Sequence, residues 1–183
     1  MKITRETSLR ELAFIVCSHL NQCNIKAVLT GGAAVTIYTH GRCQSYDLDF
    51  ISFSTAKEIR RAMEKLGFHK NAGRHYTHPE TDFFIEFPSP PLCIGRLPIT
   101  KWAELVSEVG VLSILTPTQC VMDRLAGFYH WNDQGSFDQA VAVAVNQEID
   151  VTAIRAWSQN EGMLVKFKIF LAAYTKHTDF LSP

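Results

Sequence analysis

Residues 29–51 read LTGGAAVTIYTHGRCQSYDLDFI, and this stretch decides the fold. The short apolar run 27–30 is typical of a buried strand, and it leads directly into the glycine pair 31–32. The next residues, 33–41, end in glycine and predict a helix. Residues 47–52 (DLDFIS) then predict a second strand. The segment therefore encodes a strand, a Gly-Gly turn, a helix and another strand.

The second strand carries two carboxylates on one face. Because side chains alternate along a strand, Asp47 and Asp49 point to one side, whereas Leu48 and Phe50 point into the core. Two neighbouring carboxylates repel each other at neutral pH. A divalent cation removes this repulsion, and Mg²⁺ is commonly held by one or two carboxylates together with substrate phosphates. The pattern predicts a metal site on this strand.

The glycine pair predicts a phosphate site beside these carboxylates. Glycine lets backbone N–H groups approach phosphate oxygens closely, and the positive end of the following helix attracts them. A third carboxylate is available on the predicted strand 82–87, where Glu86 and Asp82 share one face. Three carboxylates suit a two-metal site for in-line phosphoryl transfer. Glu86 is our first choice for the third acid, with Asp82 as the alternative.

Outside this segment the chain alternates helices and strands and then becomes helical, which predicts an α/β (α+β) fold with a mixed sheet. The further predicted elements are helices over 9–21 and from 54/55 to 67, strands over 74–77, 82–87, 103–107 and 111–115, and helices capped at Thr116, Ser136 and Asp150 or carried by 163–174. We expect an α/β core over 1–115, with residues 116–183 as a helical part packed on it.

Composition limits the classes of function. The chain has 183 residues and a formal net charge of +0, which argues against general binding of nucleic acid or anionic membranes by bulk electrostatics. The start has no apolar signal core, and no apolar stretch approaches the roughly 20 residues that span a bilayer. We therefore expect a cytoplasmic protein with no membrane partner. The five cysteines form no CxxC pair, so we expect reduced, mostly buried thiols.

The order GlyGly, helix, Asp-x-Asp strand and later strand acid resembles the signature of the polymerase-β-like nucleotidyltransferase superfamily. Within it, TGGAAV…YTHGRCQSYDLDFI is similar to small bacterial nucleotidyltransferases of abortive-infection and toxin–antitoxin systems. The resemblance implies the minimal nucleotidyltransferase sheet, with Gly31 and Gly32 holding a nucleoside triphosphate. It also implies that Asp47, Asp49 and Glu86 are catalytic acids and ligands of Mg²⁺ or Mn²⁺.

The same resemblance implies transfer of a nucleoside monophosphate from the triphosphate to an acceptor hydroxyl, with release of pyrophosphate. The acceptor could be a protein hydroxyl, an RNA end or a small molecule. Arg42 and Ser45 are expected to flank the phosphate region in a supporting role. Ala33 departs from the family, which often has Ser or Thr at this position, and it removes one hydroxyl contact to phosphate. The alternative is a catalytically silent fold that binds a protein partner encoded nearby, such as an antitoxin component.

Three further features favour plain structural interpretations. The histidines at 69, 75 and 78 lack a cysteine at ligand spacing, so exposed loop and hairpin positions are favoured over zinc. The basic run 57–74 is more typical of a charged outer helix face than of a polynucleotide-binding patch. Asp123 and Arg124 resemble a helical segment near the nucleotide in some relatives, but solvated helix faces are the favoured interpretation.

Overall fold

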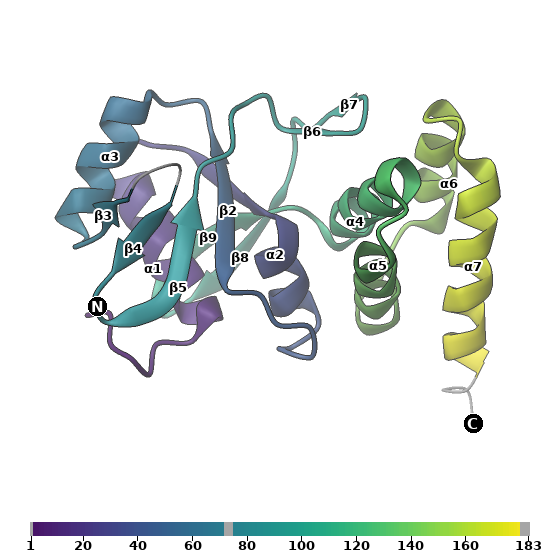
Figure 1. The fold of residues 1–183 in the computed structure, drawn as a ribbon, viewed down its shortest axis with the longest axis horizontal. Coiled ribbons are helices and arrows are strands. Elements are labelled where there is room, and N and C mark those ends of the chain that lie inside the picture. The colour runs from purple at the N-terminus through teal and green to yellow at the C-terminus, as the bar shows by residue number, and fades with distance from the viewer. Residues whose placement is uncertain (1, 72–74, 180–183) are drawn as a thin grey trace.

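The computed structural model describes residues 2–71 and 75–179. Among these, the central layer is a mixed sheet of seven strands in the order β3-β4-β5-β2-β1-β9-β8, with a separate two-stranded ribbon, β6-β7. The strands are β1 (Ala27–Thr30), β2 (Asp47–Ser52), β3 (His69–Lys70), β4 (Tyr76–His78), β5 (Thr81–Glu86), β6 (Cys93–Ile94), β7 (Leu97–Pro98), β8 (Ala103–Ser107) and β9 (Gly110–Ile114). The helices are α1 (Leu9–Gln22), α2 (Gly31–Tyr38), α3 (Ala56–Lys65), α4 (Pro117–Trp131), α5 (Gln134–Asn146), α6 (Val151–Asn160) and α7 (Leu164–Asp179). The predicted mixed fold with a helical C-terminal part is confirmed (Figure 1).

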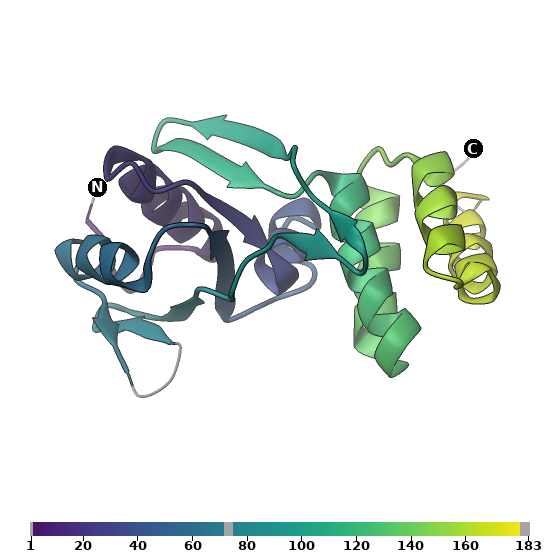
Figure 2. The ribbon, with the colours of Figure 1, turned by 90° about the horizontal axis from the view of Figure 1, so that it is seen from above.

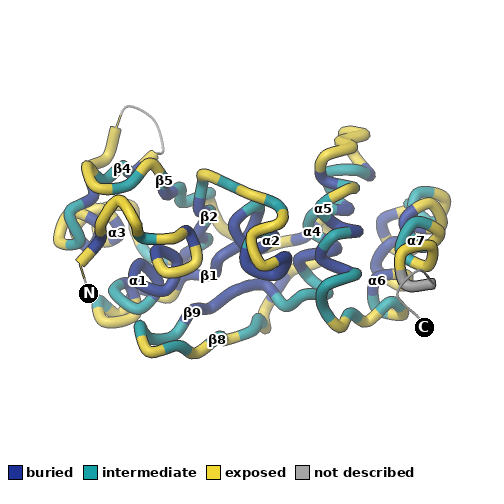
Figure 3. The backbone as a smooth tube through the Cα atoms, turned by 90° about the horizontal axis from the view of Figure 1, so that it is seen from below, coloured by how far each residue is buried: buried dark blue, intermediate teal, exposed yellow. Residues whose placement is uncertain are grey.

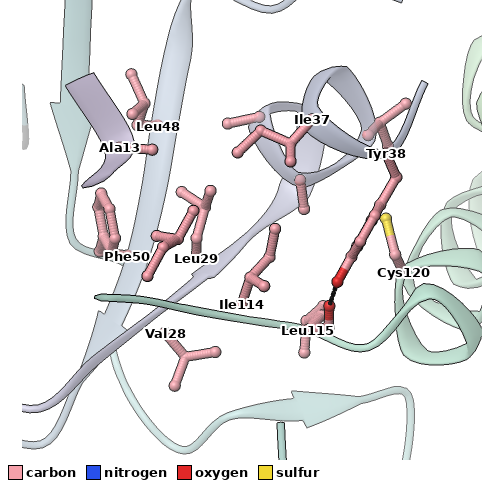
Figure 4. Close-up of a cluster of buried hydrophobic side chains, with 14 of the residues drawn as sticks. Ala13, Val28, Leu29, Ile37, Tyr38, Leu48, Phe50, Ile114, Leu115 and Cys120 are labelled. Carbon is pink, nitrogen blue, oxygen red and sulfur yellow. Dashed lines mark hydrogen bonds between the residues drawn. The ribbon is translucent and has the colours of Figure 1, made fainter. Parts of the chain in front are cut away.

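The core of the sheet lies on the face opposite to the two aspartates. Leu48 and Phe50 of β2 are fully buried, as predicted, and they lie close to Leu29 of β1 and Ala13 of α1 (Figure 4). Each such side chain contributes about 1.5–3 kcal/mol to folding when it leaves water. This packing leaves the other face of β2 half-buried, so the aspartates remain accessible from one side.

Capping residues determine where most helices begin. Ser8, Thr55 and Thr116 each accept a hydrogen bond from a backbone N–H three residues later, which confirms the predicted starts of α1, α3 and α4. The prediction for Ser136 is wrong, because α5 begins earlier with Asp133 as its N-cap. Ser136 is buried, and its hydroxyl donates to Asp133 Oδ2 at 2.6 Å. The carboxylate is thus held in place to cap the helix.

The predicted hairpin around residues 78–80 is present as β4 and β5, although β4 begins at Tyr76. The predicted strand position Arg74 lies outside the described residues. The strand predicted at 111–115 is β9, displaced by one residue. These differences are confined to the ends of elements.

The C-terminal helices continue from the sheet through α4. Figures 1 and 2 show α4 and α5 beside α2, and α6 and α7 on the far side of that pair. Two hydrogen bonds hold α2 here: Tyr38 Oη donates to the Leu115 carbonyl at 2.6 Å (Figure 4), and Gln147 Nε2 donates to the Tyr38 carbonyl at 2.8 Å. The end of α2, opposite to the glycine pair, is therefore tied to the start and the C-terminal side of the helical part. The division of the chain at residue 115 stays a prediction.

The hairpin β6-β7 was not predicted, because two-residue strands have no period to recognise. It is attached to the helical part by two hydrogen bonds. Trp157 Nε1 donates to the Ile94 carbonyl at 3.2 Å, and the Arg96 N–H donates to Glu161 Oε1 at 2.8 Å. Glu161 is buried, so this backbone N–H compensates part of the cost of burying its carboxylate.

No helix in the described ranges is long and apolar enough to cross a membrane. All five cysteines are free thiols. Cys17 and Cys120 are buried, Cys23 and Cys43 are half-buried, and Cys93 is exposed. The prediction of mostly buried thiols is therefore wrong for Cys93 and only partly met by the two half-buried thiols.

Lys166 joins α7 to the end of α4, where helix carbonyls have no partner within the helix. Its ammonium donates to the carbonyls of Phe128 and Tyr129 at 2.7 and 2.6 Å and to Asn132 Oδ1 at 2.6 Å. We expect Lys166→Met to lower the free energy of unfolding by about 2 kcal/mol, because charge-assisted hydrogen bonds are lost at a helix C-terminus. Urea unfolding measures this loss. The exposed Lys168 on the same helix provides the control, and an equal loss for Lys168→Met would contradict the assignment.

Candidate active site

The register of two parallel strands brings the predicted carboxylates together. Asp47 of β2 pairs with Phe84 of β5, and Asp49 pairs with Glu86. Paired residues of neighbouring strands point to the same face of a sheet, so Asp49 and Glu86 lie side by side, with Asp47 two positions away on that face. Glu86 lies far from the two aspartates in the sequence but adjacent to them in the sheet.

The structure distinguishes the two candidates for the third acid by position. Asp82 lies four residues before Glu86, which is about 13 Å along the strand, and it is exposed. Glu86 is close enough for its charge to act on Asp49, and only 23% of its side chain is exposed. The geometry therefore favours Glu86 as the neighbour of the two aspartates, whereas its catalytic role stays a prediction.

The glycine pair packs directly against the aspartates. Gly31 has φ +66°, and a Cβ at this position would lie 2.6 Å from Asp49 Oδ2. A Cβ at Gly32 would lie 2.8 Å from Ser45 Oγ and 3.9 Å from Asp47 Oδ1. Each glycine thus faces a different aspartate. Only glycine leaves this space open, and at Gly31 the left-handed backbone conformation favours glycine independently.

The first turn of α2 keeps its backbone N–H groups available. Within the described residues no side chain caps this helix, in contrast to α1, α3 and α4. The N-cap residue Thr30 instead donates its hydroxyl to the Asp49 carbonyl at 3.3 Å. Uncapped N–H groups at the positive end of a helix form a site for anions such as phosphate. The site therefore combines an anion-binding helix end with a row of carboxylates.

The two predicted supporting residues are placed differently. Ser45 Oγ donates hydrogen bonds to Asp47 Oδ1 and, at 3.2 Å, to the Asp47 carbonyl, so it lies within the site and orients the first aspartate. Arg42 follows the opposite end of α2, roughly 12 Å of helix away from Gly31. Its guanidinium donates to Asn146 Oδ1 at 3.1 Å, and this contact does not bring it to the aspartates.

His75 contacts the third acid, which sequence analysis did not anticipate. Its Nε2 lies 2.6 Å from Glu86 Oε1, and its ring stacks on Phe84 with centroids 4.9 Å apart. No group of three or more His, Cys, Asp or Glu side chains among residues 2–71 and 75–179 is already arranged to hold a metal ion. One oxygen of Asp47 accepts from Ser45, and one oxygen of Glu86 lies against His75.

The surroundings of Asp49 disfavour its ionised form. Burial raises its pKa from 3.8 to about 6, and the negative charges of Asp47 and Glu86 act in the same direction. The positive charge of Arg124 opposes this rise. An ionised Asp49 is therefore unfavourable in the protein alone, and a bound cation would relieve the cost.

This pKa shift predicts a pH-dependent stability. The pKa of Asp49 is higher in the folded chain than its ordinary value of 3.8, so the folded state holds the proton more strongly. The contribution of this group to stability is full below about pH 4 and declines as the pH rises to about 6. We expect a decline of about 1–2 kcal/mol, since the carboxyl is partly solvated. Urea unfolding in EDTA across this window measures it, and Asp49→Asn should lack the decline that Asp82→Asn retains.

Arg124 of α4 is a basic residue whose charge acts on Asp49. Its Nη2 donates to Asp123 Oδ2 at 2.6 Å and its Nη1 to Gln139 Oε1 at 3.4 Å, and it acts electrostatically on Asp49. The side chains of Arg124 and Asp123 are only 22% and 23% exposed. The favoured interpretation of a solvated helix face is therefore wrong for both residues. The packing of α4 against α2 places them here, and no local sequence signal shows that packing.

Searches with family models and among curated proteins give no match, but solved structures share the fold. An antigenic nucleotidyltransferase-like protein from Paracoccidioides brasiliensis superposes with a TM-score of 0.60 at 13% identity, covering 90% of this chain and 94% of its own. The solution structure of the antibiotic-resistance factor ANT(2'')-Ia gives 0.48 at 14% identity, with 92% and 96% covered. Its crystal structure in complex with adenylyl-2''-tobramycin gives 0.47 at 12%, with 91% and 97% covered. The chain therefore has a nucleotidyltransferase-like fold, as predicted.

Proposed function

We propose that this chain is a metal-dependent nucleotidyltransferase, which transfers a nucleoside monophosphate from a nucleoside triphosphate to an acceptor hydroxyl. One observation carries the proposal: the uncapped start of α2 lies directly against both aspartates of β2, and the strand register adds Glu86 beside Asp49. The helix end that would bind phosphate and the carboxylates that would bind the metal therefore lie next to each other. The likeness in fold to a nucleotidyltransferase-like protein supports this function.

The residues present fit a divalent cation. Asp47 and Asp49 would supply oxygen ligands and Glu86 a third, and a cation would favour the ionised form of Asp49, which burial and the neighbouring acids disfavour. Phosphate oxygens from the nucleotide would complete the ligand set, because one oxygen of Asp47 and one of Glu86 already contact Ser45 and His75. When bound, Mg²⁺ or Mn²⁺ supplies charge neutralisation and polarises the reacting phosphate.

The side chains of this chain have distinct tasks in the transfer. The N–H groups at Gly31 and Gly32 bind phosphate oxygens and orient the triphosphate. Glu86 accepts the proton of the acceptor hydroxyl, whose oxygen forms a bond to the α-phosphorus while the bond to the bridging oxygen breaks and pyrophosphate leaves. Ser45 holds Asp47 in position. The carboxylates among these groups lie on one face of β2 and β5, and the glycine pair and Ser45 lie against them.

Arg124 contributes positive charge from the helical part. Its guanidinium contacts Asp123 and Gln139, and its positive charge acts on Asp49, which supports a role near the reacting phosphates. We propose that it stabilises the triphosphate and the leaving pyrophosphate. This assignment gives the C-terminal helices a part in nucleotide binding.

Transfer is tested with nucleotides labelled at either end. The protein is incubated with each of the four nucleoside triphosphates, labelled at the α- or the γ-phosphate, together with Mg²⁺ and a cell lysate. Relative to lysate without the protein, we expect additional α-label in an acceptor and no additional transfer of γ-label, because the γ-phosphate leaves in pyrophosphate. Separation of labelled protein, RNA and small molecules then identifies the acceptor class. The acid-matched control is Asp82→Asn, which should retain activity that Asp49→Asn loses.

The alternative, a silent fold that binds a protein partner encoded nearby, predicts a different result. No label would be transferred, and a partner would co-purify equally with the wild type and with Asp47→Ala/Asp49→Ala. That outcome would contradict the proposed enzyme. Additional transfer of γ-label that depends on the added protein would contradict it as well, because it would indicate a kinase.

A further inference from the structure

A cavity of about 660 Å³ lies beside the proposed active site but on the other face of the sheet. It is enclosed by the start of α1, the second half of α2, the exposed segment that joins α2 to β2 (Figure 3), and Phe83 of β5. Tyr46 and Phe83 line it, and both alternate with residues of the acidic face, Asp47 and Phe84. Their side chains therefore point away from the acids, and Glu86 does not line the cavity.

The lining indicates the class of ligand. Four side chains make apolar or aromatic walls, namely Leu9, Ile37, Tyr46 and Phe83. The rings of Tyr46 and Phe83 lie 6.1 Å apart, and Tyr46 is 62% exposed. The volume falls within the range of about 300–1,000 Å³ that is typical of small-molecule sites. A ligand with a flat, apolar ring system would fit between these walls.

The lining carries a positive charge from Arg10. Arg10 and His40 line the cavity, whereas no Asp or Glu is part of the lining formed by the described residues. Arg10 lies over the ring of Phe14, with its guanidinium 5.4 Å from the centroid, so its side chain is held at the rim. A ligand with one anionic group beside a planar body would match this charge.

The cavity shares a wall with the phosphate site. Ser45 lines the cavity and donates to Asp47 Oδ1, and it also lies against Gly32. Thr36 lines the cavity as well, and its hydroxyl donates to the Gly32 carbonyl at 3.1 Å. A molecule that displaces either hydroxyl therefore changes a direct contact of the glycine pair or of the first aspartate.

We propose that this cavity binds a small planar apolar anion, and that its occupancy is coupled to the hydrogen bond between Ser45 and Asp47. That the ligand of this cavity controls nucleotide binding rests on the proposed function. The binding of the ligand and its coupling to the Ser45–Asp47 hydrogen bond can both be measured without nucleotide. Failure of the transfer assay would therefore leave this proposal standing.

Binding is measured by titrating the full chain with anilinonaphthalene sulfonate, a fluorescent planar anion, in the absence of nucleotide. We expect one binding site per chain and a roughly tenfold loss of affinity in Arg10→Glu, because one charged contact is reversed. Arg10 lies in the first turn of α1, where an acidic residue favours the helix, so this variant should fold. The control is Arg5→Glu, the same charge change outside the lining. Near-ultraviolet circular dichroism and unfolding midpoints exclude dye binding to partly unfolded chains. Equal affinity in Arg10→Glu and the wild type would overturn the assignment.

Coupling is measured with a residue outside the cavity. Asp47 does not line it, yet Asp47→Asn replaces the charged carboxylate that accepts from the Ser45 hydroxyl by a neutral amide, whose oxygen is a weaker acceptor. We expect this variant to change the affinity for the dye about fivefold, a typical coupling between neighbouring sites. Asp82→Asn removes an acid of the same sheet face that does not contact Ser45, and it should leave the affinity unchanged. Identical affinities of Asp47→Asn and the wild type would overturn the coupling.

Discussion

An Asp49→Asn variant is expected to melt at a higher temperature than the wild type while it loses nucleotidyl transfer by about a thousandfold. The gain in stability follows from the raised pKa of Asp49, because burial and the neighbouring charges of Asp47 and Glu86 make its ionised form unfavourable at neutral pH. Relief of about 1–2 kcal/mol corresponds to a rise of about 3–6 °C for a chain of this size. The loss of transfer follows from removal of a metal ligand, which contributes several kcal/mol to the transition state.

Two controls separate this result from a general effect on folding. Leu48→Ala changes the neighbouring residue on the buried face, and it should lower the free energy of unfolding by about 2–5 kcal/mol. Asp82→Asn removes an exposed acid of the same sheet, and both stability and transfer should stay near those of the wild type. A thermal melt in EDTA and the transfer assay provide the readouts. If Asp49→Asn lowered the melting temperature as far as Leu48→Ala, the assignment of an acidic metal site would be contradicted.

A Gly31→Ala variant is expected to lose about 3 kcal/mol of folding free energy and about a hundredfold in transfer. The left-handed backbone of Gly31 penalises any side chain by about 1–2 kcal/mol, and the new methyl group would lie 2.6 Å from Asp49 Oδ2. The carboxylate or the first turn of α2 must then move. A shift of about 1 Å in a positioned group commonly costs about a hundredfold in rate.

Gly162 provides the matched control for backbone strain. It also has a positive φ, +74°, but a Cβ there would meet nothing within 4 Å. Gly162→Ala should therefore lose only the strain of about 1–2 kcal/mol and leave transfer unchanged. Urea unfolding and initial rates of both variants measure the difference. Equal losses of stability in the two variants would show that Gly31 is not packed against Asp49.

The parts of the fold that could be predicted depend on local signals. The strand before the glycine pair and the strand that begins at Asp47 have the predicted bounds, because turn residues and alternation mark them. The starts of α1, α3 and α4 follow from capping boxes, in which a side chain and a backbone N–H lie within one turn. These elements could be predicted because the residues that form each signal lie close together in the sequence.

The parts that could not be predicted depend on contacts between distant segments. The strand register decides that Glu86, and not Asp82, lies beside Asp49, whereas the sequence places both acids on one face. Arg124 reaches the site only because α4 packs against α2. In addition, Asp133 and Ser136 both suit an N-cap, and the burial of Ser136 decides between them. Each of these outcomes is set by tertiary packing, which overrides local preference.

The proposed metal-dependent nucleotide site is tested most directly by the binding of a nucleoside triphosphate analogue that cannot release pyrophosphate. Isothermal titration calorimetry in the presence of Mg²⁺ measures this binding. This measurement does not require the acceptor, and it examines the acids and the glycine pair as one site. We expect binding that is lost in EDTA and in Asp47→Asn/Asp49→Asn, and that is retained in Asp82→Asn. Binding of equal affinity in EDTA, in the double variant and in the wild type would contradict the proposed site.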